Sequence, residues 1–94
     1  MSLAEPTLSS AFVIVNELGM HARAAARLVQ LASRFSSEIE LEKDGQRVNA
    51  KSVMGVLLLC AHKGSTVTVY VRGSDAGAAL QAIGELIQQG FGEL

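Results

Sequence analysis

Apolar and polar residues alternate along two stretches of this chain, residues 38–43 and 65–72. Strict alternation indicates a β-strand with one face toward a core and the other toward water. A third stretch, residues 10–16, is rich in β-branched and aromatic residues and also predicts a strand. Asp44-Gly45 predicts a tight hairpin turn, because both residues accept positive φ angles. Residues 46–50 are therefore expected to return along the 38–43 strand.

Between these strands, apolar residues recur at spacings of three and four, which indicates amphipathic helices. One helix is expected from Ala22 until Ser36-Ser37 end it. A shorter one is expected from residue 53 to about residue 61, and a last one after residue 75 as far as Gly90. Ser52 is the expected N-cap of the middle helix, and Gly64 suits the left-handed position that closes it.

The predicted order of elements is β-α-β-β-α-β-α, without an internal repeat or a linker. Each strand offers one dry face, and three amphipathic helices are available to cover these faces. The pattern therefore predicts an α+β fold with two layers. It leaves the pairing order of the strands open. Residues 1–9 are expected to form a flexible tail and residues 10–94 a single domain.

The composition narrows the class of protein. With 94 residues, 49% of them hydrophobic and 18% charged, the chain is large enough for one globular core. A net charge of -1 and the absence of tryptophan argue against nucleic acid and anionic membranes as partners. No secretory signal is visible, and the longest apolar run is far shorter than the roughly 20 residues of a membrane helix. We therefore expect a cytoplasmic protein.

The single cysteine and the spacing of the two histidines argue against an internal disulfide and against a metal site. Cys60 has no second cysteine for an internal disulfide, which suits a reducing compartment, and we expect it to be a small buried apolar residue. His21 and His62 lack a cluster of cysteines or carboxylates at ligand spacing. We therefore expect neither a metal nor a cofactor.

The candidate chemistry lies in Gly19-Met20-His21-Ala22-Arg23, at the expected start of the first helix. A helix start carries free N–H groups and a partial positive charge, so it can hold an anion such as phosphate. The helix dipole and Arg23 both disfavour an imidazolium there, so the ring is expected to be neutral. A neutral ring nitrogen beside an anion site is a nucleophile toward a phosphoryl group. The alternatives are an ordinary surface histidine and a helix cap.

A second stretch, Lys51-Ser52-Val53-Met54-Gly55, follows about thirty residues later, and Gly90-Phe91-Gly92-Glu93 ends the pattern. Together with the order of elements, these stretches resemble the HPr family, the histidine-containing phosphocarriers of the bacterial phosphoenolpyruvate-dependent phosphotransferase system. The resemblance runs from about Ser10 to Glu93. It implies an open-faced two-layer sandwich, in which three helices cover one face of a four-stranded antiparallel sheet.

The resemblance also implies a role. Enzyme I passes a phosphoryl group from phosphoenolpyruvate to the histidine, and the carrier gives it to an enzyme II component of A type in sugar uptake. Such a protein is a phosphocarrier with a phosphohistidine intermediate, and not a turnover enzyme on its own. By this resemblance, His21 carries the phosphoryl group on Nδ1 and Arg23 helps to hold its oxygens.

One position departs from the family pattern. The family usually has proline at the place of Ala24, where its fixed φ suits the first helical turn. Alanine is a good helix former, so the helix is expected to persist. The change leaves an additional N–H group near the phosphate, and the backbone N–H groups of Ala22 and Ala24 are the candidates for phosphate binding.

The resemblance suggests a regulatory site and a docking surface as well. Some members have a serine at the place of Ser52 that is phosphorylated by a serine kinase, with an opposing phosphorylase, and the alternative is that Ser52 is a plain N-cap. Met20, Met54 and Leu57 are typical core residues, yet the family has an exposed apolar patch at these places. Arg27 is expected to pair with acidic partner residues. The partners implied are Enzyme I and enzyme IIA components, with the carrier itself a monomer.

Two other functions remain open from the sequence. A carrier of the same chemistry can serve a regulatory branch that controls nitrogen or carbon metabolism, and Ala24 together with the very apolar segment 56–59 leaves room for it. A protein of another class, an interaction module without phosphoryl transfer, would use the same fold. The presence of His21 argues against this second alternative.

Overall fold

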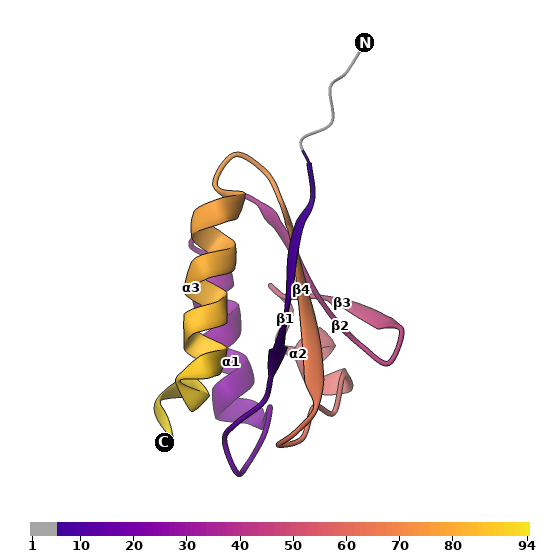
Figure 1. Cartoon of the computed structure of the whole chain (residues 1–94), viewed down its shortest axis with the longest axis vertical. Coiled ribbons are helices and arrows are strands. Elements are labelled where there is room, and N and C mark those ends of the chain that lie inside the picture. The colour runs from indigo at the N-terminus through magenta and orange to yellow at the C-terminus, as the bar shows by residue number, and fades with distance from the viewer. Residues whose placement is uncertain (1–5) are drawn as a thin grey trace.

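Residues 6–94 are described by a computed structural model, in which four strands and three α-helices follow the predicted order (Figure 1). The strands are β1 (Leu8–Val13), β2 (Glu38–Lys43), β3 (Gln46–Asn49) and β4 (Thr66–Arg72). The helices are α1 (Ala22–Ala32), α2 (Val53–Leu58) and α3 (Ala76–Gln88), followed by the short 3-10 helix η1 (Gly90–Gly92).

The sheet has the strand order β1-β4-β2-β3, and all neighbouring strands are antiparallel. This order joins the first and last strands of the chain, a long-range pairing that the sequence pattern left open. Helix α3 packs against β1 and β4, α1 against α2 and α3, and α2 against β3. In Figure 1, α1 and α3 lie side by side against one face of the sheet. The open-faced sandwich is thereby confirmed.

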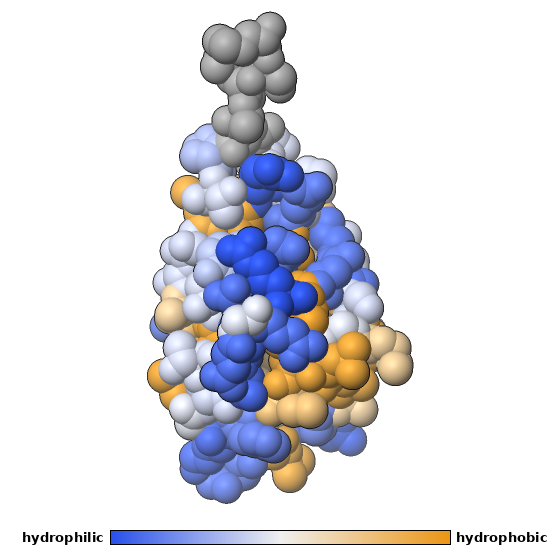
Figure 2. Space-filling model, turned by 90° about the vertical axis from the view of Figure 1, so that its right-hand side faces the viewer, coloured by the Kyte–Doolittle hydropathy of each residue, from blue (hydrophilic) through white to orange (hydrophobic). Residues whose placement is uncertain are grey.

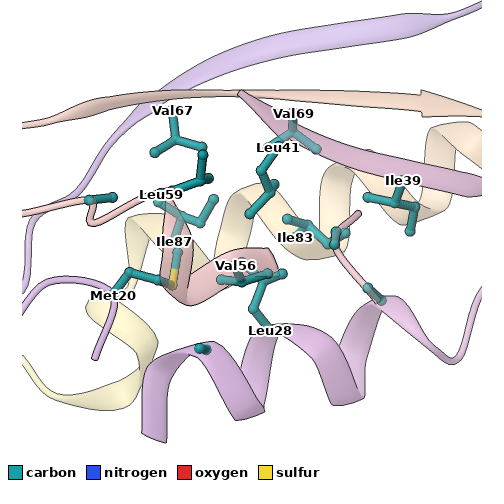
Figure 3. Close-up of a cluster of buried hydrophobic side chains, with 14 of the residues drawn as sticks. Met20, Leu28, Ile39, Leu41, Val56, Leu59, Val67, Val69, Ile83 and Ile87 are labelled. Carbon is teal, nitrogen blue, oxygen red and sulfur yellow. The ribbon is translucent and has the colours of Figure 1, made fainter. Parts of the chain in front are cut away.

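The core lies between the sheet and the helices. Valines at alternate positions of β4 face inward, and leucine and isoleucine side chains of the helices meet them (Figure 3). The larger fully buried aliphatic residues are Ile14, Leu28, Ile39, Leu41, Val56, Val67, Val69, Val71, Ile83 and Ile87. The alternation seen in the sequence therefore has the expected cause, since it separates the dry face of each strand from the wet one.

Several boundaries differ from the predictions. Strand β1 begins at Leu8, and Leu8 and Ser9, expected in the tail, pair with Val71 and Tyr70. Residues 1–5 of the expected tail lie outside the described residues. Helix α1 ends at Ala32, three residues before the expected end.

The end of α2 also differs from the prediction. The helix ends at Leu58, and the left-handed residue that follows it is Cys60, with φ of 50°, and not Gly64. The Cys60 N–H donates to the Leu57 carbonyl at 3.1 Å, so the last turn tightens and the chain leaves the helix early. The prediction of a buried cysteine is wrong, because this turn exposes Cys60.

Candidate functional site

His21 is the N-cap of α1, and this helix begins at Ala22 as predicted from the sequence. Its backbone is extended, with φ of -77° and ψ of 178°, and its carbonyl accepts the first helical hydrogen bond, from the Ala25 N–H at 2.9 Å. The ring atom Nδ1 accepts a hydrogen bond from the Arg23 N–H at 3.3 Å. Nδ1 therefore lies at the helix start, where free N–H groups and the helix dipole favour an anion.

The loop that precedes His21 requires glycine at position 19. Gly19 has φ of +62°, and a Cβ atom on it would lie 2.6 Å from the Ala61 carbonyl oxygen. The next residue, Met20, donates its N–H to this same oxygen at 2.9 Å. This contact therefore holds Met20 against the loop at Ala61 and places His21 directly before the first residue of α1.

Met20 is consequently a core residue. Its exposed fraction is 5%, and its side chain lies beside Ile87 and Leu59 (Figure 3). The expectation that Met20 belongs to an exposed docking patch is wrong. The reason is the backbone at Gly19, which the spacing of apolar residues does not reveal.

Glu93 lies against the other side of the imidazole. Its Oε2 atom pairs with His21 Nε2, and its Oε1 atom accepts a hydrogen bond from Asn16 Nδ2 at 2.9 Å. Because a carboxylate accepts only, Nε2 is assigned as the protonated nitrogen, and the lone pair of a neutral ring is then on Nδ1. The two side chains are 26% and 19% exposed, so water still reaches the ring.

The charge on Glu93 is stabilised where it lies. The hydrogen bond from Asn16, followed by that from His21, lowers the pKa of the Glu93 carboxyl. The expectation of a neutral His21 weighed only the helix start and Arg23, and the structure adds this carboxylate on the opposite side. Sequence reasoning did not identify Glu93 as a site residue. The available signal was its place in Gly90-Phe91-Gly92-Glu93.

Two arginines of α1 have different surroundings. Arg23 is exposed next to His21, in a position to reach an anion at the helix start. Arg27, one turn further, donates from its guanidinium to the Phe91 carbonyl and so contacts the segment that carries Glu93. A role of Arg27 toward partner proteins stays a prediction beside this internal contact.

The backbone at the helix start fits the predicted phosphate contacts in part. The N–H groups of Ala22 and Ala24 precede the first helical hydrogen bond, so neither has an intrahelical partner. The side chain of Ala22 is exposed, whereas that of Ala24 is fully buried in the core. Alanine at position 24 therefore preserves the helix, as expected.

Helix α2 lies next to α1 and presents apolar side chains to solvent. Met54 is 69% exposed and Leu58 61%, with Val53 also exposed, whereas Leu57 is half-buried and packs against the core. In Figure 2, hydrophobic surface gathers on the right of the lower half of the molecule. Ser52 is the N-cap, as predicted, and its Oγ accepts from the Gly55 N–H at 3.1 Å.

Within residues 6–94, no three histidine, cysteine or acidic side chains are grouped as metal ligands would be. Over the same residues, no helix has both the length and the apolar character needed to cross a membrane.

Comparison with known proteins places this chain in a family. The family model described as "PTS HPr component phosphorylation site" matches residues 8–89. The chain belongs to the HPr family. It is 45% identical over 86 residues to the phosphocarrier protein HPr of Xylella fastidiosa strain 9a5c. This match covers 92% of this chain and 97% of that protein.

Solved structures of HPr proteins give the same result. The HPr-C-His structure from Thermoanaerobacter tengcongensis has a TM-score of 0.89 and 44% identity, covering 93% of this chain and 98% of that one. An HPr dimer from the same organism has a TM-score of 0.75 and 46% identity, covering 87% and 94%. The chain is an HPr-type phosphocarrier of the phosphotransferase system. Family membership implies phosphotransferase partners such as Enzyme I and enzyme II.

Proposed function

We propose that His21 accepts a phosphoryl group on Nδ1 from phosphorylated Enzyme I and passes it to an A-type enzyme II component in sugar uptake. The observation that carries this proposal is the orientation of the ring. Nδ1 lies at the start of α1 beside the Arg23 N–H, and Nε2 is paired with Glu93. The nucleophilic nitrogen and the anion site are thus next to each other.

The proposed transfer is a direct displacement at phosphorus. The lone pair of Nδ1 attacks phosphorus, and the bond from phosphorus to the Enzyme I donor breaks, with its electron pair going to the donor. The Arg23 guanidinium and the N–H groups of Ala22 and Ala24 are the proposed partners of the phosphoryl oxygens. Arg23→Glu is expected to slow the transfer while leaving the thermal unfolding temperature nearly unchanged.

Docking is proposed to use the apolar surface of α2. Met54 and Leu58 are the most exposed large side chains of this helix, and α2 packs directly on α1, whose first residue follows His21. Methionine repacks easily against different partners, and a small apolar patch suits weak complexes that exchange rapidly. Leu57 is expected to contribute less than these two residues, because it is half-buried.

The direct test is phosphorylation with phosphoenolpyruvate and a cognate Enzyme I. The chain is expected to gain one acid-labile phosphoryl group by mass spectrometry, and His21→Ala is expected to gain none. His62→Ala, which removes the other histidine of the chain, is the matched control and should be labelled normally. Labelling of His21→Ala at the normal rate would contradict the assignment, and a chain that is never labelled would favour the interaction module.

Transfer of the phosphoryl group from the carrier to its acceptor is tested by a second measurement. The labelled carrier is mixed with enzyme IIA components of the sugar-uptake type and of the regulatory type, and the label on each is followed over time. Faster transfer to the sugar-uptake components is the expected result. Preference for the regulatory components would support the nitrogen- or carbon-control branch instead.

A further inference from the structure

The carboxylate of Glu93 is fixed by both of its oxygens. Oε2 pairs with His21 Nε2, and Oε1 accepts from Asn16 Nδ2 at 2.9 Å. Asn16 is itself fully buried, and the same Nδ2 group donates to the Gly19 carbonyl at 2.8 Å. The amide that orients the carboxylate is therefore anchored in the loop that also places the imidazole. Asn16 therefore fixes the position of Glu93 relative to His21.

A second contact holds the segment that carries Glu93. Residues 90–93, called here the strap, turn back over α1 through three successive left-handed residues: Gly90, Phe91 and Gly92. Phe91 is fully buried, which anchors the strap in the core, and its carbonyl accepts from the Arg27 guanidinium. Phe91 at φ of 57° is a costly conformation for a residue with a side chain. The fold keeps this conformation and brings Glu93 to the ring.

The charge balance of phosphoryl transfer shows what a carboxylate at Nε2 does. When neutral imidazole with Nε2–H attacks phosphorus through Nδ1, the product ring carries a positive charge. When the N–P bond later breaks, its electron pair returns to Nδ1, and a ring that kept Nε2–H leaves as neutral imidazole. A ring without that proton would have to leave as imidazolate, a far poorer leaving group. The proton on Nε2 therefore decides how readily the phosphoryl group departs.

We propose that Glu93 is a positioning residue that keeps the proton on Nε2 of His21 while the phosphoryl group is on Nδ1, and that Arg27 supports it by holding the strap. The inference rests on the proposed function of His21 and adds a determinant of phosphoryl-transfer potential. The electrostatic attraction between the carboxylate and the phosphorylated, cationic ring favours the form that keeps the Nε2 proton, just as a carboxylate stabilises the imidazolium of an unmodified histidine. Glu93 itself forms no bond to phosphorus.

The first test compares Glu93→Gln with the unaltered chain. Glutamine preserves the shape but removes the charge, and its single amide oxygen can accept from Asn16 or from the His21 Nε2–H, but not from both. At alkaline pH, donation from the phosphorylated variant to an enzyme IIA component is expected to slow by at least about tenfold, because at best a neutral hydrogen bond replaces the charged one at Nε2. Glu85→Gln removes a carboxylate from the exposed face of α3 and is the matched control, with no expected change.

A spectroscopic measurement separates this role from a structural one. With ¹⁵N-labelled histidine, the phosphorylated chain is expected to show a protonated Nε2 at an alkaline pH where Glu93→Gln shows a largely deprotonated one. The heteronuclear spectrum of the rest of the chain should stay unchanged. Identical Nε2 signals in the two proteins, or equal donation rates, would overturn the proposal. Both results still require label on His21, so they leave the proposed function intact, whereas absence of label in the unaltered chain would refute that function first.

Arg27 supplies an independent variant. Arg27→Gln is expected to slow donation by a smaller factor than Glu93→Gln, because the strap is loosened but Asn16 still contacts Glu93. Arg27→Lys keeps a cation that reaches the Phe91 carbonyl and should restore most of the rate. Arg34→Gln, an exposed arginine beyond the C-terminal end of the same helix, is the control. A normal rate and a normal Nε2 signal in Arg27→Gln would remove Arg27 from the proposal.

Discussion

The α-carbon of Gly19 lies so close to Ala61 that a Cβ atom would be 2.6 Å from the Ala61 carbonyl oxygen. That oxygen already accepts the Met20 N–H at 2.9 Å. Two loops that are about forty residues apart in sequence are thus joined immediately before His21. The position of the histidine depends on this contact as much as on α1.

Gly19→Ala is expected to damage both stability and phosphoryl transfer. Alanine at φ of +62° is strained, and its methyl group would collide with the backbone oxygen of Ala61. The expected loss in free energy of unfolding is about 2 kcal/mol or more, measured by urea denaturation. The rate of labelling by Enzyme I should fall as well, because the loop must move to relieve the collision.

Gly45→Ala is the matched control for this substitution. Gly45 also has a positive φ, of +81°, but a Cβ atom there would meet no atom within 4 Å. It should lose only about 1 kcal/mol, from backbone strain alone, with a normal labelling rate. Equal losses in the two variants would show that the contact with Ala61 has no effect of its own.

Met20 and Met54 form a second matched pair. Met20→Ala removes a buried side chain and is expected to lower the free energy of unfolding by about 2–5 kcal/mol. Met54→Ala removes a side chain that is 69% exposed, so its effect on stability should be within about 0.5 kcal/mol. Met54→Ala should instead raise the KM for the carrier in the Enzyme I reaction. A normal KM would place docking elsewhere.

The contrast between these methionines shows what the sequence was able to predict. The element order and the start of α1 follow from periodicity and capping, which are local and leave a record in neighbouring residues. The burial of Met20 depends on one left-handed glycine and its contact with Ala61. Hydrophobicity alone does not distinguish a core methionine from a docking methionine, and for this reason the prediction that Met20 lies in the docking patch is wrong.

Long-range contacts set the other limit on what the sequence predicts. The pairing of β1 with β4 and the contact of Glu93 with His21 join residues that are far apart in the chain. No local pattern specifies them, because they follow from how the finished layers pack. The resemblance supplied the four-stranded antiparallel sheet, and the residues at the helix start indicated the histidine, while the carboxylate at Nε2 became visible only in three dimensions.

Ser52 supplies a prediction about regulation. Its hydroxyl caps α2 by accepting from the Gly55 N–H, so Ser52→Ala is expected to cost about 1 kcal/mol in unfolding free energy. Ser52→Asp keeps an acceptor and adds a negative charge beside the apolar surface of α2. It is expected to slow labelling by Enzyme I with little change in stability, as a phosphate there would.

Ser74→Asp is the control for this charge effect. Ser74 lies in the β4–α3 loop, at the opposite end of the molecule from the start of α1 (Figure 1). The same added charge there should leave the labelling rate unchanged. Treatment of the unaltered chain with an HPr serine kinase, followed by mass spectrometry, tests the modification itself, and absence of phosphate on Ser52 would count against regulation at this residue.

Asp75 gives the fold a defined sensitivity to acid. Its carboxylate accepts from the Ser36 N–H at 2.9 Å and from the Ser37 N–H at 3.0 Å, and both serine hydroxyls also donate to it. These hydrogen bonds, led by the one from the Ser37 hydroxyl, lower the pKa of Asp75 from 3.8 to about 2. They join the start of α3 to the start of β2, which explains why Asp75 makes no side-chain cap of its own helix.

The stabilisation from Asp75 has a predictable pH range. A carboxyl whose pKa is lower in the folded state stabilises the fold fully above the unfolded pKa, and this contribution is lost as the pH falls through the folded pKa. Asp75→Asn should therefore be less stable than the unaltered chain at neutral pH, with the difference shrinking as the pH falls from about 4 to about 2. Asp44→Asn, in the hairpin turn with a side chain 85% exposed, is the control. A stability difference for Asp75→Asn that stayed constant over this pH range would show that the serine contacts do not depend on the charge.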